Sequence, residues 1–105
     1  MSLTPRLIDK LERLTERYQE LNALLADPAT IADQPRFLQL SREHAELHDT
    51  VDSFAHYQKT AGELRHAEEM RVSETDAELR ELAEQENTRL ASELAMTASR
   101  VGGPQ

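Results

Sequence analysis

Residues 7–25 of the chain read LIDKLERLTERYQELNALL, and this stretch decides the expected fold. Its apolar side chains recur at alternating steps of four and three residues, the spacing of a helix that packs along another helix. Thr4 can cap the helix, and Pro5 then takes the first helical position, where a missing N–H costs nothing. The stretch therefore predicts a helix from about residue 5 to about residue 26. The row consists of Leu7, Leu11, Leu14, Tyr18, Leu21 and Leu25.

The Asp27-Pro28 pair marks the end of this helix, because proline disfavours a helical conformation in the residue before it and cannot donate a hydrogen bond. A short loop through Ala32 is expected next. Asp33 is then a suitable N-cap for a second helix over about residues 34–71, which would be roughly 55 Å long at 1.5 Å per residue. This long helix would be the centre of the molecule.

The apolar pattern lapses at residues 72–76, where capping residues cluster, and a third helix is expected over about residues 76–100. Gly-Gly-Pro then gives a stop signal, so residues 102–105 are predicted to be a tail. The fold class predicted is all-α: an elongated antiparallel three-helix array with a long central helix. Residues 1–101 are expected to form a single helical domain.

The composition favours a soluble protein-binding module. Only 38% of residues are hydrophobic and 30% are charged, which suits narrow helical seams better than a thick core. The net charge of −8 would repel a nucleic-acid backbone, so protein partners are expected and DNA is not. The lack of cysteine suits the reducing cytoplasm, and no apolar stretch is long enough for a membrane span. We therefore expect a cytoplasmic protein without a membrane partner.

Two histidine patterns have spacings that occur in metal sites. His44 and His48 are four residues apart and would share a helix face, but Glu46 between them matches no zinc-protease motif and no third ligand is apparent. Glu63 and His66 form a single Glu-x-x-His pattern, which di-iron bundles use twice. Partly exposed helix residues are the simpler interpretation of both patterns. No metal, no cofactor and no enzymatic activity are expected.

The run over residues 11–47, LERLTERYQELNALLADPATIADQPRFLQLSREHAEL, resembles the opening of the bacterial peptide chain release factor 1 family. In the sister family, release factor 2, a tryptophan-containing loop is expected here, and this chain has no tryptophan. The first family is therefore favoured. The letters that carry the resemblance are Leu24-Leu25, Asp27-Pro28, Ile31, Asp33, Arg36-Phe37 and Leu40-Ser41-Arg42-Glu43.

The resemblance implies an N-terminal helical domain of a translation-termination factor. The tripeptide that reads the stop codon and the Gly-Gly-Gln loop that promotes hydrolysis belong to later domains of the family, so no catalytic residue is carried over to this chain. The resemblance also implies docking at the ribosome, at the stalk base of the large subunit through a ribosomal protein, and coupling to release factor 3. The remaining domains of the same factor would be further partners, and the separate domain could self-associate.

Four residues are candidates for partner contacts, because they match the family's sequence and are not part of the apolar row. They are Asp27, Asp33, Arg36 and Arg42. A simpler explanation remains open for the two aspartates, since capping and breaking helices would account for them. An alternative function also remains open, that of a freestanding acidic helical adaptor or oligomerisation module unrelated to translation.

Overall fold

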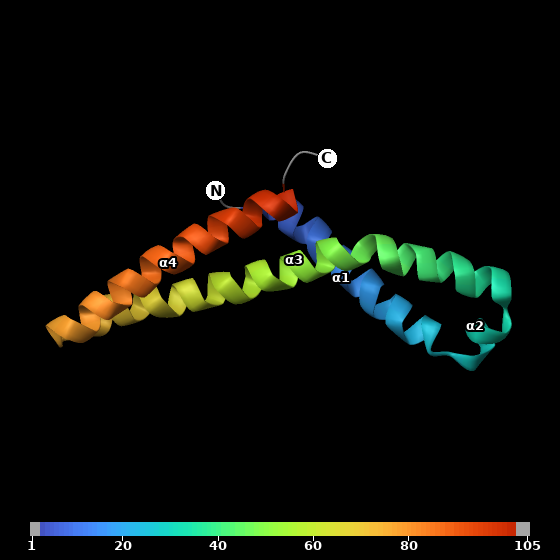
Figure 1. Cartoon of the computed structure of the whole chain (residues 1–105), viewed down its shortest axis with the longest axis horizontal. Helices are drawn as coiled ribbons and strands as arrows, with labels where there is room; N and C mark the ends of the chain where they lie inside the picture. Colours follow the sequence, from blue (N-terminus) through green and yellow to red (C-terminus); the bar gives the residue numbers. More distant parts are fainter. Residues whose placement is uncertain (1–2, 103–105) are drawn as a thin grey trace. The chain divides into compact units, whose positions relative to one another are not determined.

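The structure is a computed structural model that describes residues 3–102. Its helices are α1 (Pro5–Leu25), α2 (Pro28–Ala32), α3 (Gln34–Ser73) and α4 (Ala77–Gly102) (Figure 1). No strand occurs in this part of the chain, so the all-α class and the long central helix are confirmed. Gly102 closes α4, and the rest of the predicted tail, residues 103–105, lies outside the described residues.

The helices form two compact units. The first unit covers residues 4–52 and holds α1, α2 and the first half of α3. The second unit is built from residue 3 and residues 53–102, and it consists mainly of the second half of α3 and of α4. The central helix therefore contributes one half to each unit.

Helix α1 begins as its sequence predicts. The Thr4 hydroxyl oxygen accepts a hydrogen bond from the backbone N–H of Leu7 at 3.2 Å, and Pro5 follows at the first helical position. Leu11 and Leu21 from the predicted row are buried, whereas Leu14 is only half-buried. The apolar row therefore identifies the inward face of α1, with its burial concentrated at two leucines.

The segment expected to be a loop contains a short helix, α2, and this expectation was wrong. Asp27 Oδ1 accepts a hydrogen bond from the backbone N–H of Ala29 at 3.1 Å, so Asp27 caps α2 while Pro28 occupies its first position. The same two residues that end α1 therefore start another helix. A helix of only 5 residues is too short to show an apolar period, which is why the pattern missed it.

In the first unit, α1 runs antiparallel to the first half of α3. The Arg17 guanidinium bridges to Glu43 through two bonds, from Nε to Oε2 at 2.6 Å and from Nη2 to Oε1 at 2.8 Å. The Tyr18 ring stacks on the His44 ring with centroids 4.4 Å apart. Leu21 and Leu40 are buried in the same unit. Polar and aromatic contacts thus fix the pairing of the two helices beside a small apolar core.

In the second unit, α3 and α4 form an antiparallel hairpin (Figure 1). Asp76 Oδ1 accepts from the backbone N–H groups of Glu78 and Leu79 at 2.9 and 3.3 Å, which caps α4 directly after the turn. His56 Nε2 donates to Glu93 Oε1 at 2.9 Å across the hairpin. The buried residues of this unit are Leu3, Phe54, Tyr57, Thr60, Ala67, Ala83, Leu90, Thr97, Ala98 and Val101.

Two leucines of α4 near the turn are not in this core. The side chains of Leu79 and Leu82 are 48% and 59% exposed. A hairpin of two helices can bury only the stripe along which the helices touch, so apolar residues beside that stripe remain in water. This exposure concerns the end of the hairpin near the turn.

Candidate interaction surfaces

The predicted contact residues Asp27 and Asp33 both act as helix caps. Asp27 caps α2 as described above, and Asp33 Oδ1 accepts a hydrogen bond from the backbone N–H of Arg36 at 3.2 Å at the start of α3. Each carboxylate is exposed but already bonded to a helix N-terminus. The simpler explanation, that the two aspartates serve the local structure, therefore accounts for their positions.

The two predicted arginines present their charges to solvent. Arg36 and Arg42 are exposed, and neither forms an ion pair with any residue between 3 and 102. Arg42 borders a shallow depression of about 470 Å³ on α3, together with the half-exposed Leu38. The first half of α3 thus combines a guanidinium with an apolar side chain, a pairing that is common in protein interfaces. The structure brings Arg42 beside Leu38 but assigns Asp27 and Asp33 to capping.

The histidines considered as metal ligands contact α1 instead. His44 Nε2 donates to the Asn22 side-chain oxygen at 2.7 Å, and His48 Nδ1 lies 3.0 Å from the Tyr18 hydroxyl. Between residues 3 and 102, no group of three or more histidine, aspartate or glutamate side chains is placed to hold a metal ion. The spacing of His44 and His48 is therefore explained by helix pairing.

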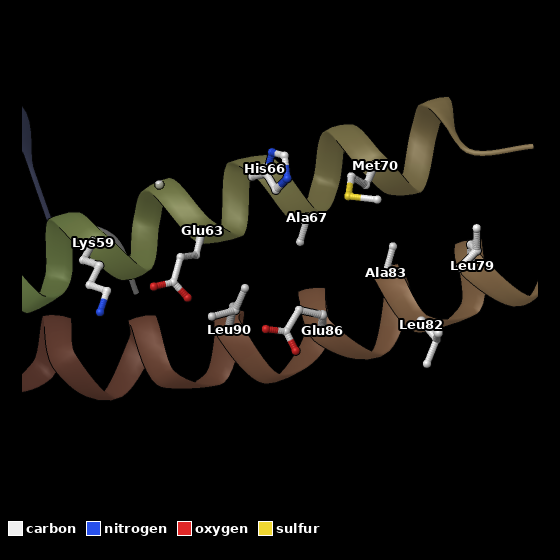
Figure 2. Close-up of a pocket in the computed structure, with 11 residues that line it drawn as sticks. Lys59, Glu63, His66, Ala67, Met70, Leu79, Leu82, Ala83, Glu86 and Leu90 are labelled. Carbon is white, nitrogen blue, oxygen red and sulfur yellow. The ribbon is translucent and has the colours of Figure 1, made fainter.

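A second surface lies between α3 and α4, and its lining includes Glu63 and His66 of the Glu-x-x-His pattern (Figure 2). It is an open groove of about 660 Å³ near the turn of the hairpin. Figure 2 shows Ala67 of α3 facing Ala83 of α4, while the carboxylate of Glu63 reaches from α3 toward α4. The lining residues are Lys59, Gly62, Glu63, His66, Ala67, Met70, Leu79, Leu82, Ala83, Glu86 and Leu90.

Ion pairs on the hairpin run mostly along a single helix. Glu68 pairs with Arg71 at 2.5 Å on α3, and Glu86 pairs with Arg89 at 2.5 Å on α4. The hydrogen bonds from these arginines lower the pKa of Glu68 and of Glu86, so both carboxylates stay ionised near neutral pH. Glu86 lines the groove between α3 and α4 with its charge paired to Arg89, whereas Glu68 is not among the groove residues.

Among residues 3–102, no helix combines the length and apolar character that crossing a membrane requires. The helices between residues 3 and 102 define a small all-α module with exposed surfaces on α3 and between α3 and α4. The chain belongs to the PCRF domain family, whose model matches residues 14–102.

Three relatives illustrate the match, and each is named peptide chain release factor 1. The relative from Geotalea uraniireducens is 45% identical over 80 residues, and that from Pelobacter propionicus is 44% identical over 80 residues; both alignments cover 76% of this chain and 22% of the relative. The relative from Enterococcus faecalis is 36% identical over 95 residues, or 90% of this chain and 27% of the relative. The expected resemblance to release factor 1 is thereby confirmed.

The chain spans about a quarter of the length of these relatives, 22–27%. No solved structure matches the chain.

Proposed function

We propose that this chain is a domain of a translation-termination factor and that it helps to attach the factor to the ribosome. The observation that carries the proposal is the family match over residues 14–102, together with 36–45% identity to proteins named peptide chain release factor 1. A generic helical adaptor would not be expected to share this extended similarity. The match therefore favours the termination factor over the adaptor.

The docking site that we propose is the stalk base of the large ribosomal subunit, reached through a ribosomal protein, with release factor 3 as a second partner. The net charge of −8 supports a role in binding basic proteins, because opposite charge speeds encounter and disfavours wrong partners. A second attachment point also raises the effective concentration of a factor at its main site. Action on ribosomes would place the protein in the cytoplasm.

We assign neither codon reading nor peptide hydrolysis to this chain. Its sequence ends in Gly-Gly-Pro-Gln, in which proline interrupts the Gly-Gly-Gln order that the resemblance associates with hydrolysis. The groove between α3 and α4 also has no serine, threonine, cysteine or tyrosine in its lining that could act as a hydroxyl or thiol nucleophile. The function that remains is binding, with Arg36 and Arg42 as the candidate contacts on the first unit.

The attachment role can be tested directly with the chain itself. Labelled chain should co-sediment with ribosomes, and a full-length release factor 1 in excess should displace it. Arg36→Ala and Arg42→Ala together should weaken binding, whereas Arg13→Ala on α1, whose guanidinium already pairs with Asp9, should not. Ribosome binding that no release factor displaces would contradict the proposal.

Deletion of the equivalent segment from a full-length factor tests whether the segment contributes to attachment and not to peptide release. Single-turnover peptide release at saturating factor should be largely unchanged, while multiple-turnover release with release factor 3 should slow. If single-turnover release collapsed while binding persisted, the segment would be shaping the catalytic conformation, and the docking role would be wrong.

A further inference from the structure

Within the second unit, no described element covers the groove between α3 and α4. Met70 is 40% exposed, and Leu79 and Leu82 are 48% and 59% exposed, although all three line the same groove. Smaller residues, Ala67 and Ala83, are buried between the helices. Apolar side chains that line a concave surface while facing water are typical of a binding site for a protein partner.

The shape of the groove fits a third helix. The α3 wall extends from Lys59 to Met70 and the α4 wall from Leu79 to Leu90, with lining residues at steps of three and four on both. At 1.5 Å per residue these walls are roughly 16 Å long, which corresponds to about three turns of an α-helix. Two parallel rows at this spacing form a groove into which the side-chain ridge of another helix packs.

The charge around the groove indicates which kind of helix would bind there. Residues 59–90 contain nine carboxylates and five lysine or arginine side chains. Glu63 lines the groove, is exposed, and forms no ion pair with any residue between 3 and 102. A second copy of this chain would itself carry a net charge of −8 and would be repelled by the first. A basic partner would be attracted by this negative charge, whereas a second acidic copy of the chain would be repelled by it.

We propose that this groove binds a basic amphipathic helix of another protein. The apolar face of that helix would cover Met70, Leu79 and Leu82, and its lysine or arginine side chains would lie near Glu63 and Glu86. This inference deepens the docking role proposed above and depends on that role only for the identity of the protein that supplies the helix.

The test uses the whole chain and a fluorescent peptide of leucine and lysine, about 14 residues long, in which the leucines share one helical face. Two control peptides accompany it: one has the same composition with the leucines spread around the helix, and one carries glutamate in place of lysine. Fluorescence anisotropy reports binding, and backbone amide NMR shifts report the site. Only the first peptide should bind tightly, with its largest shifts at Gly62, Ala67 and Ala83.

Variants locate the site on the chain. Leu79→Ser with Leu82→Ser should weaken peptide binding by at least about tenfold, because both leucines would lose apolar contact with the peptide. Met96→Ser is the matched control, since Met96 is 64% exposed on the same helix outside the groove, and it should leave the affinity unchanged. Glu63→Gln should weaken binding about threefold at low salt and less at high salt. Circular dichroism checks that each variant keeps its helix content.

Gly62→Ala provides a variant that cannot act by unfolding the chain. A Cβ at this position meets only Arg65 Nη2, at 4.0 Å, so the substitution suits the free helix while placing a methyl group on the groove lining. We expect a more stable chain that binds the peptide a few times more weakly.

Three results would overturn the proposal: no preference for the amphipathic basic peptide, equal affinities for the double leucine variant and the Met96 control, or sedimentation showing that the groove is closed by a second copy. None of these results bears on ribosome co-sedimentation. Loss of ribosome binding with peptide binding intact would instead remove the attachment role and leave the groove as a helix receptor.

Discussion

Replacement of Gly62 by alanine is the perturbation whose effect on stability follows most directly from the structure. Gly62 lies within α3, and no described glycine has a positive φ angle, so its backbone suits any L-residue. The nearest atom that an added Cβ would meet is Arg65 Nη2 at 4.0 Å, which is ordinary van der Waals contact with the end of a flexible side chain. The folded state therefore accepts the methyl group without strain.

The expected gain in stability comes mainly from the unfolded chain. Glycine inside a helix is less favourable than alanine by about 0.8–1 kcal/mol, because it loses more backbone freedom on folding. We therefore expect Gly62→Ala to raise the free energy of unfolding of the hairpin by about 0.5–1 kcal/mol. With an m-value of about 2 kcal/mol per molar urea, the unfolding midpoint should rise by about 0.4 M.

The assay is urea unfolding followed by far-ultraviolet circular dichroism. Ala55→Gly is the matched control, because Ala55 is exposed on the same helix and the change is the reverse one. It should lower the midpoint by a similar amount. A midpoint for Gly62→Ala below that of the parent chain would show that the helix backbone needs glycine at this position, and the reasoning from helix propensity would fail.

Three further measurements test the rest of the structure. Leu21→Ala should lower the free energy of unfolding by about 2–4 kcal/mol, because Leu21 is 0% exposed, whereas the exposed Glu81→Ala should change it by less than about 0.5 kcal/mol in the same urea titration. The hydrogen bond from Arg17 lowers the pKa of Glu43, so this carboxylate stabilises the fold above its ordinary pKa of 4.5 and stops doing so as the pH falls through the lower folded value. The difference in melting temperature between the parent chain and Glu43→Gln should accordingly shrink only at acid pH, and a difference that persisted at pH values below both pKa values would contradict the assignment. Asp76→Ala should cost about 1 kcal/mol by removing the cap of α4, and Asp76→Ser should restore most of it, since serine can accept the same backbone hydrogen bonds; equal losses in both would exclude capping as the cause.

The features of this protein that depend on local chemistry could be predicted from its amino-acid sequence. Thr4 and Pro5 predict where α1 begins, and the lapse in apolar spacing after residue 71 predicts the turn before α4. These features follow from residues within one or two turns of each other, because capping, proline geometry and apolar spacing act over that distance. The family resemblance could also be recognised from the sequence, because the residues that carry it lie within one contiguous stretch.

Which residues are buried depends on how the helices pack and could not be predicted from local sequence. The second half of α3 buries Thr60, which an apolar pattern does not select, while α4 leaves Leu79 and Leu82 exposed. A polar residue such as Thr97 is accommodated because its hydroxyl donates to the Glu93 backbone oxygen at 2.9 Å within the same helix.

The pairing of Arg17 with Glu43 and the groove between α3 and α4 also required the tertiary structure. Arg17 and Glu43 are 26 residues apart in the chain and meet only because α1 and α3 run antiparallel. The groove has two walls from helices joined by a turn, and its accessibility depends on the absence of a third helix over them among the described residues. Apolar spacing shows that a helix has a face to bury, but only the packing of the helices shows whether that face is covered.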